Sequence, residues 1–156
     1  MAPLVVTSAA PGDAPEVAQI HIKAMDYNEL LHAQFPSEEA LDFLQRYLEK
    51  ETVEFLQSDG KGVLVGRDSE SGEIAGFAKW IVHREGDDDA PADDVWPSFC
   101  RAEYLNPYAD LTARVRKSVM GSAPYYRKFP SGVERDSATC ACACSTQNEP
   151  LKCTAD

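Results

Sequence analysis

The sequence predicts an α/β domain over residues 1–126 and a tail outside the domain over residues 127–156. The first reason is a set of short β-branched and aromatic runs, which are typical of strands. The second is a set of segments with apolar residues three and four positions apart, which is typical of helices. The third is the loss of both patterns after Tyr126. At 156 residues, of which 44% are hydrophobic, the chain is long enough for one domain with its own core.

A strand and a helix open the domain. Residues 4–7, Leu-Val-Val-Thr, predict the strand, and Pro11-Gly12 predicts the turn that ends it. Asp13 and Glu16 have the spacing of a capping box, which predicts that a helix begins there. The predicted inner face of this helix carries Val17, Ile20 and Ala24.

A second helix is predicted after Ser37, because a serine side chain is suited to the N-cap position. The sequence Ser58-Asp59-Gly60 predicts its end. The apolar side chains at helical spacing are Leu41, Leu44 and Leu48. The charged side chains expected outside are Glu38, Glu39, Asp42, Arg46 and Glu49.

The strongest strand signal is a hairpin. Residues 63–67 and 74–82 are apolar and β-branched, and the turn-rich residues 68–73 connect them. Phe77 and Trp80 are three positions apart and therefore point to opposite faces of their strand. We expect one of the two in the core.

An acidic loop is predicted over residues 85–94, which include Gly86 and Pro91. Asp87 and Asp89 are hard oxygen ligands, so a calcium loop is the alternative. The segment lacks the glycine and the closing glutamate of such loops at their usual spacing, which favours a solvated loop and no metal site.

The last regular elements are a helix and the start of a strand. Asn106-Pro107 predicts the first turn of the helix, and Gly121 predicts its end. Pro124-Tyr125-Tyr126 predicts the strand. One stripe of the helix carries Tyr108, Leu111, Val115 and Val119, and its C-terminal half carries Arg114, Arg116 and Lys117.

The tail is small, polar and rich in cysteine, and it has no helical or strand period. It contains too few apolar residues to offset the entropy of ordering it. Thiolates at Cys140, Cys142, Cys144 and Cys153 could bind zinc or copper. Alternate residues of an extended chain point to opposite sides and no histidine lies nearby, so we expect no metal site.

The formal net charge of −11 argues against nucleic-acid and anionic-membrane partners, because both would be repelled. Residues 1–10 carry no basic flank and only a short apolar run, and no segment is long enough to span a membrane. We therefore expect a cytoplasmic protein whose partners are small molecules or proteins.

Two segments carry a family resemblance. Residues 71–80, Ser-Gly-Glu-Ile-Ala-Gly-Phe-Ala-Lys-Trp, and residues 120–126, Met-Gly-Ser-Ala-Pro-Tyr-Tyr, follow a strand and two helices. This pattern resembles the front half of the GNAT superfamily of acyl-CoA-dependent N-acetyltransferases, and its fungal members in particular, over about four-fifths of the chain. The resemblance implies a GNAT-like mixed sheet with flanking helices, acetyl-CoA as cofactor, and a small-molecule or protein amine as acceptor.

The resemblance also implies a cofactor loop of the type Q/R-x-x-G-x-G/A after the fourth strand. Its backbone N–H groups would bind the pyrophosphate of acetyl-CoA at the start of a helix. Gly132 is the only glycine after Gly121, so we expect no cofactor-binding residues in this chain and little or no activity. Catalytic residues stay unassigned. The alternative is a non-catalytic protein-binding module that uses an exposed sheet edge, with self-association as one outcome.

A change of reading frame between Tyr126 and Pro130 explains the tail. With Ser131 as AGC, Arg135 as CGG and one choice of third bases, the codons for residues 130–136 read in another frame give Gln-Arg-Arg-Gly-Ala-Gly, which is a loop of the missing type. In the same frame the alternating Cys-Ala sequence becomes Leu-Arg. We therefore expect that the tail is out of frame or disordered.

A few single residues are candidates for a substrate-side or a surface position. The substrate-side candidates are Tyr27 and Phe35, which flank the connection between the first two predicted helices, and Trp80 on the second strand of the hairpin. We expect His21 and His32 at the surface or at helix caps rather than as catalytic bases, whereas His83 at a strand end is open to either interpretation.

Overall fold

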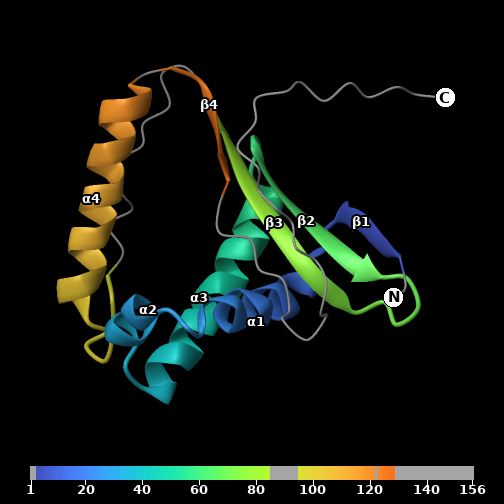
Figure 1. Cartoon of the computed structure of the whole chain (residues 1–156), viewed down its shortest axis with the longest axis horizontal. Helices are drawn as coiled ribbons and strands as arrows, with labels where there is room; N and C mark the ends of the chain where they lie inside the picture. Colours follow the sequence, from blue (N-terminus) through green and yellow to red (C-terminus); the bar gives the residue numbers. More distant parts are fainter. Residues whose placement is uncertain (1–2, 85–94, 122, 129–156) are drawn as a thin grey trace.

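Four antiparallel strands form one sheet in the order β1-β2-β3-β4 (Figure 1). The computed structural model describes residues 3–84, 95–121 and 123–128. The strands are β1 (Leu4–Ser8), β2 (Lys61–Asp68), β3 (Ile74–His83) and β4 (Tyr125–Lys128). A short 3₁₀ turn (Pro11–Asp13) precedes the helices α1 (Ala14–Met25), α2 (Glu29–Gln34), α3 (Glu38–Gln57) and α4 (Ala102–Met120). The predicted α/β class and all four predicted strands are confirmed.

The β2–β3 hairpin forms the centre of the sheet. Val65 lies opposite Phe77, and the register shifts by a bulge between Gly66 and Arg67. In the connecting turn the carboxylate of Asp68 accepts hydrogen bonds from two backbone N–H groups, at 2.8 and 2.9 Å. Gly72 adopts a positive φ of 77°, which side chains other than glycine rarely tolerate. These turn residues explain why the hairpin is readable from the sequence.

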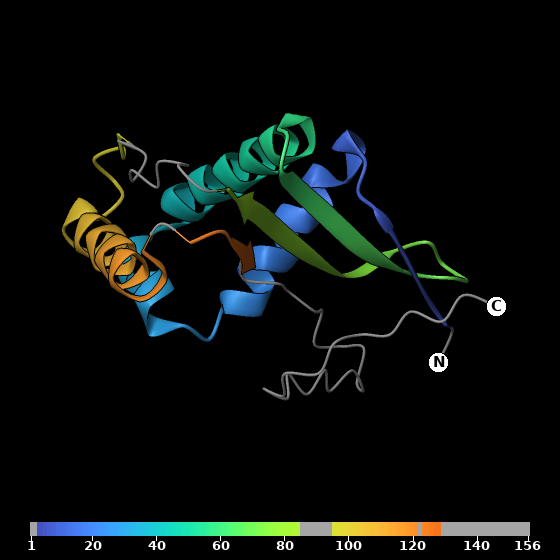
Figure 2. The ribbon, with the colours of Figure 1, turned by 90° about the horizontal axis from the view of Figure 1, so that it is seen from above.

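Helices α1 and α3 cover one face of the sheet, as Figure 2 shows from above. Val17 and Ile20 of α1 pack against Val65 and Phe77 of the hairpin, and all four side chains are buried. The predicted inner face of the first helix is therefore confirmed for these two residues. Burial of each such side chain contributes roughly 1.5–3 kcal/mol.

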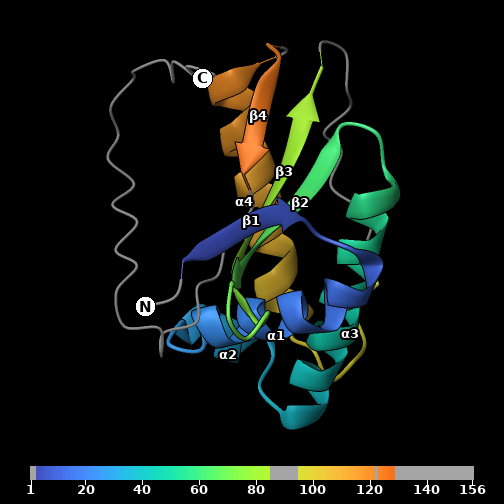
Figure 3. The ribbon, with the colours of Figure 1, turned by 90° about the vertical axis from the view of Figure 1, so that its right-hand side faces the viewer.

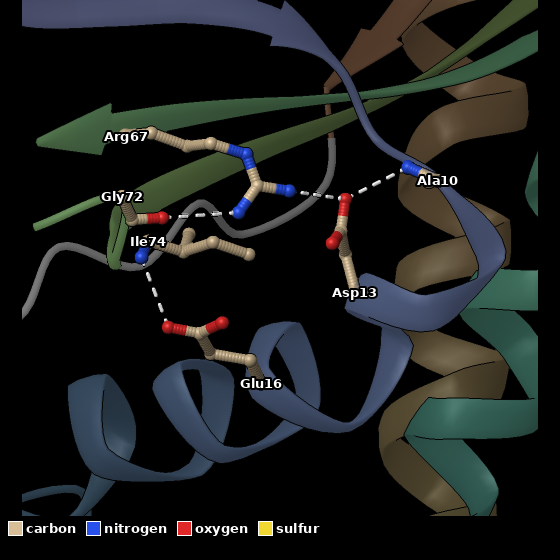
Figure 4. A network of polar contacts seen from close by, with 6 residues as sticks. All are labelled: Ala10, Asp13, Glu16, Arg67, Gly72 and Ile74. Atoms are coloured by element: carbon tan, nitrogen blue, oxygen red, sulfur yellow. Dashed lines mark hydrogen bonds and ion pairs between the residues drawn. The ribbon is translucent and has the colours of Figure 1, made fainter. Parts of the chain in front are cut away.

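The start of α1 differs from the predicted capping box. Asp13 and Glu16 do not cap this helix together; both carboxylates bind the sheet and the chain before the helix (Figure 4). Asp13 accepts a hydrogen bond from the Ala10 N–H at 2.8 Å and pairs with Arg67 at 2.6 Å. Glu16 accepts a hydrogen bond from the Ile74 N–H at 2.9 Å. Because both carboxylates make these contacts, neither accepts a capping hydrogen bond at the start of α1.

The predicted cap of the long helix is confirmed, because the Ala40 N–H donates to the Ser37 hydroxyl at 3.2 Å. A short helix that the sequence did not predict, α2, lies between α1 and α3. Asn28 caps it by accepting a hydrogen bond from the Leu30 N–H at 3.0 Å. Leu31 holds it to the core.

A second apolar cluster lies away from the sheet, between α1, α2, α3 and the segment before α4. An aromatic group of Phe43, Tyr47, Trp96 and Phe99 packs against it, with ring centroids 5.3 to 6.4 Å apart. Edge-to-face and tilted aromatic pairs at such distances are favourable. This cluster fixes the beginning of α4 to the rest of the domain.

Helix α4 begins earlier than predicted. It starts at Ala102, so Pro107 lies inside the helix and not in its first turn. The reason is tertiary, because Leu105 packs against the second cluster and the Arg101 N–H donates to the Gln34 carbonyl at 3.0 Å. The predicted end at Gly121, with φ of 59°, is confirmed.

One face of the hairpin carries Val63, Val65, Phe77 and Ile81. Three of them are buried, and only Ile81 is partly exposed. Helices α1 and α3 are sufficient to cover this face. Most of the exposed large apolar side chains among the described residues lie elsewhere, on β1 and α4.

Two predicted metal alternatives, the acidic loop of residues 85–94 and the tail cysteines, lie outside the described residues. Within residues 3–84, 95–121 and 123–128, no three potential ligand side chains gather into a metal site.

None of the helices in this part of the chain combines the length and the apolar character needed to cross a bilayer.

The ion pair between Asp13 and Arg67 generates a stability prediction. Burial alone would raise the pKa of Asp13, but the hydrogen bond from Ala10 and the charge of Arg67 outweigh it and lower the pKa. A lowered carboxyl pKa stabilises the fold above the unfolded value, about 3.9, and this stabilisation is lost as the pH falls through the folded pKa. Asp13→Asn should therefore lower the unfolding temperature by several degrees at neutral pH, and by less at pH 3.

The matched control is Asp59→Asn, because Asp59 pairs with Arg84 at 3.1 Å on the open surface. Exposed pairs contribute little, so this variant should unfold within about a degree or two of the parent. Equal losses in the two variants would show that the contacts in Figure 4 do not anchor α1.

Candidate functional site

The edge of the sheet at β4 is the first part of the candidate site. β4 pairs with β3 along one side, where Tyr125 lies opposite His83 and Tyr126 opposite Val82. Along its other side β4 has no partner strand among the described residues. Backbone N–H and C=O groups at such an edge are available to bind a ligand or another chain.

Two aromatic rings mark the beginning of this edge. The ring centroids of His83 and Tyr125 are 4.4 Å apart, and the rings are nearly parallel, at 12°. Because residues of a strand alternate in direction, His83 shares the helix-covered face with Lys79 and Phe77. Phe77, Lys79 and His83 therefore lie on one face of β3, and His83 is the member next to β4.

A buried ion pair lies in the middle of this row. The Lys79 side chain is only 1% exposed, and its Nζ lies 2.8 Å from a carboxylate oxygen of Glu51 on α3, which is 25% exposed. The same Nζ lies 5.5 Å from the centre of the Phe55 ring. A buried ammonium group needs such a partner, because removing it from water costs several kcal/mol.

His21 of α1 lies beside the ion pair. Its ring centroid is 5.6 Å from that of Phe77, and its Nδ1 is buried without a hydrogen-bond partner among the described residues. Burial lowers the pKa of His21, Lys79 lowers it further, and Glu51 opposes the shift, so that the pKa is about 4. The imidazole is therefore neutral at neutral pH.

This arrangement constrains the chemistry of the cluster. A general base works best with a pKa near the operating pH, so His21 at about 4 is poorly matched to that role. Lys79 is enclosed and ion-paired, and it is not placed to act as a nucleophile. The contacts of His21, Glu51 and Lys79 therefore join α1 and α3 to β3.

Cys100 is no nucleophile either. It is buried in the second cluster, and burial together with the negative charge of Glu39 raises the pKa of its thiol. A reactive cysteine needs a lowered pKa and access to solvent.

The structure places the three substrate-side candidates in different surroundings. Tyr27 is 70% exposed after α1, whereas Phe35 is buried in the second cluster, 6.0 Å from Trp96. Trp80 lies on the face of β3 opposite Phe77, and its ring covers Gly62 of β2. A Cβ atom at Gly62 would lie 2.2 Å from this ring, so a larger residue there would require the ring to move. The prediction that one of Phe77 and Trp80 enters the core is confirmed for Phe77.

The histidine predictions hold in part. His32 is exposed in the last turn of α2, and its Nε2 donates to the Asp26 carbonyl at 2.6 Å, as expected of a surface residue. The expectation for His21 was wrong, because the side chain is largely buried against Phe77.

Sequence reasoning missed the ion pair between Lys79 and Glu51. One signal was present: Lys79 has the same strand parity as the buried Phe77. A lysine at a core-facing position requires an acidic partner, but the sequence does not indicate which of the many carboxylates on the long helix supplies it.

The buried pair gives a prediction that a double-mutant cycle can test. Glu51→Gln alone should destabilise the protein by roughly 2–4 kcal/mol, because it leaves the Lys79 charge buried without compensation. The double variant Lys79→Met, Glu51→Gln should recover at least half of that loss in urea unfolding. Additive losses would show that the two side chains do not interact.

The pKa of His21 gives a prediction on pH. The unfolded chain binds a proton near pH 6.5 and the folded chain near pH 4, so this residue lowers stability progressively as the pH falls from 6.5 to 4. In His21→Leu that loss, roughly 2–3 kcal/mol, should disappear from the pH dependence of unfolding. His32→Gln, which removes an exposed imidazole, is the control. A His21→Leu profile that parallels the parent between pH 4 and 6.5 would contradict the buried neutral imidazole.

Comparisons with known proteins address the architecture around this site. No protein-family model matches the chain, and a search of curated proteins found no match. Among solved structures, the chain is similar to a histone acetyltransferase HPA2 and related acetyltransferase from Corynebacterium glutamicum, with a TM-score of 0.51 and 18% sequence identity. The likeness covers 87% of this chain and 63% of that protein. The chain thus has a GNAT-like fold, a mixed α/β arrangement that spans part of the length of that relative.

Proposed function

We propose that this chain derives from an acyl-CoA-dependent N-acetyltransferase of the GNAT superfamily, and that residues 1–126 are the front part of that domain. The observation that carries the proposal is the position of β4 at the edge of the sheet, after a strand, the helices and a hairpin in the GNAT-like order. The likeness to an acetyltransferase of solved structure supports it at the level of the fold.

The chemistry proposed for the parent domain is transfer of an acetyl group from acetyl-CoA to an amine. A base or a water chain would remove the amine proton, and backbone N–H groups would stabilise the tetrahedral oxyanion. The open side of β4 has backbone groups available for that role. On the acceptor side, Tyr27 and Trp80 are the accessible members of the predicted set, whereas Phe35 would act by packing.

The acceptor is proposed to be a small-molecule or protein amine, in the cytoplasm. The net charge of −11 favours cationic acceptors over nucleic acids or anionic lipid surfaces. The resemblance of residues 71–80 and 120–126 supports the proposal that the relatives are fungal acetyltransferases.

As written, the chain is proposed not to bind acetyl-CoA and to have little or no activity. A phosphate loop needs glycines at a helix N-terminus, and Gly132 is the only glycine in residues 122–156. The alternative frame of the codons for residues 130–136 would supply Gln-Arg-Arg-Gly-Ala-Gly at the required place, directly after β4.

The second candidate function is a protein-binding module without catalysis. It rests on the same β4 edge, which could pair with an extended segment of another protein. Such a module would need no cofactor, so acetyl-CoA binding by a frame-restored chain distinguishes the two candidates.

Calorimetric titration with acetyl-CoA tests the proposal on two chains, the chain as written and a chain read in the alternative frame from residue 130. The first should show no saturable binding, whereas the second should bind in the micromolar range, roughly −8 kcal/mol. It should also unfold several degrees higher, since the added strand and helix would cover the β4 edge.

The control is the frame-restored chain with valine at the two loop glycines, which would keep the fold but block close approach of the pyrophosphate. Tight binding by the chain as written would contradict its proposed inactivity. A frame-restored chain that neither binds the cofactor nor gains stability would remove the main support for the acetyltransferase origin.

A further inference from the structure

Helix α4 carries an exposed apolar stripe that no described element covers. The helix lies at the end of the molecule away from β1, as Figures 1 and 2 show. The stripe consists of Tyr104, Tyr108, Leu111, Val115 and Val119, which are 43, 52, 49, 52 and 72% exposed. Their spacing of four, three, four and four residues places them on one face of the helix.

This helix has little to stabilise it within one copy of the chain. None of its 19 residues is buried, and Pro107 removes one of its internal hydrogen bonds. Its first turn is attached to the domain through Leu105 and the Arg101 N–H. Helical stability in proteins comes mostly from packing of an apolar face, so the stripe is expected to have a partner.

The charges beside the stripe are divided between the two halves of the helix. The acidic residues Glu103 and Asp110 lie in its first half, and the basic residues Arg114, Arg116 and Lys117 lie in its second half. A second copy of the same helix running antiparallel therefore places acidic residues beside basic ones at both ends. A parallel copy places like charges beside each other, which is unfavourable.

The stripe is also self-complementary in this direction. With a two-fold axis between Leu111 and Thr112, Tyr104 lies opposite Val119 of the partner subunit, and Tyr108 lies opposite Val115 of the partner subunit. Each large ring thus meets a small β-branched side chain. A groove lined by Pro107, Asp110, Ala113 and Arg114 borders the stripe and offers room for the partner's side chains.

We propose that α4 is the interface of a two-fold symmetric dimer in which two copies of this helix pack antiparallel. The tail of the same chain is a poorer occupant, because residues 130–156 contain only Val133 and Leu151 as large aliphatic side chains. A helix of this length is about 28 Å long, which gives an interface at the small end of the usual range. The dimer is therefore concentration-dependent, with dissociation in the micromolar range.

Sedimentation velocity over a wide range of protein concentrations tests the dimer. The parent chain should shift from monomer to dimer, and Val115→Asp should weaken association at least tenfold while far-ultraviolet circular dichroism stays unchanged. The matched control is Val6→Asp, which makes the same change at an exposed site of β1 and should leave association unaltered. A parent chain that stays monomeric, or a dimer that Val115→Asp does not weaken, overturns the proposal.

Cysteine cross-linking tests the direction of the pair without disturbing the apolar contacts broadly. In a chain whose four tail cysteines are replaced by serine, Leu111→Cys should form a disulfide with itself under mild oxidation. Tyr104→Cys should cross-link with Val119→Cys in a mixture and not with itself. Self-linkage of Tyr104→Cys alone would indicate a parallel pair and would overturn the antiparallel assignment.

Discussion

The burial of Lys79 is the constraint on which the arrangement of the helices and the sheet depends. Its position in β3 directs an ammonium group into the core-facing side of the sheet, where it is almost inaccessible to water. Among the described residues, Glu51, which is 28 residues away in sequence, compensates this charge, so α3 lies with that carboxylate against β3. Phe55 and the neutral His21 then fill the space around the pair. The ion pair therefore fixes which face of α3 meets the sheet.

The same packing explains how the inner face of the described sheet is covered. With α1 and α3 on one face, the hairpin buries Val63, Val65 and Phe77 without further strands. Most of the exposed apolar side chains among the described residues lie on β1 and on α4, which Figure 3 shows in front of and behind the hairpin. The open edge of β4 ends the described sheet, and the proposed domain would continue from it.

Local signals predicted much of this fold. The N-cap Ser37 and the helical spacing of the leucines predicted α3, and the turn that contains Gly72 predicted the hairpin. Both signals depend on residues that are close together in sequence. The helix α2 was not predicted, because its six residues are too few to show a helical spacing of apolar side chains. Tertiary contacts overrode local rules at Asp13 and at Pro107. In the candidate site, the sequence did not distinguish the buried Phe35 from the exposed Tyr27. The pairing of Lys79 with Glu51 and the burial of His21 also depend on how distant segments meet.

We propose that the domain continues past β4 in another reading frame and that residues from 130 onward do not complete it as written. Sequencing the transcript across the codons for residues 126–137 tests this most directly. The account predicts an insertion, a deletion or an unrecognised splice junction there, after which the frame encodes a Gln-Arg-Arg-Gly-Ala-Gly loop and a helix. A single uninterrupted frame that encodes the present tail, with no glycine-rich loop in either other frame, would contradict it.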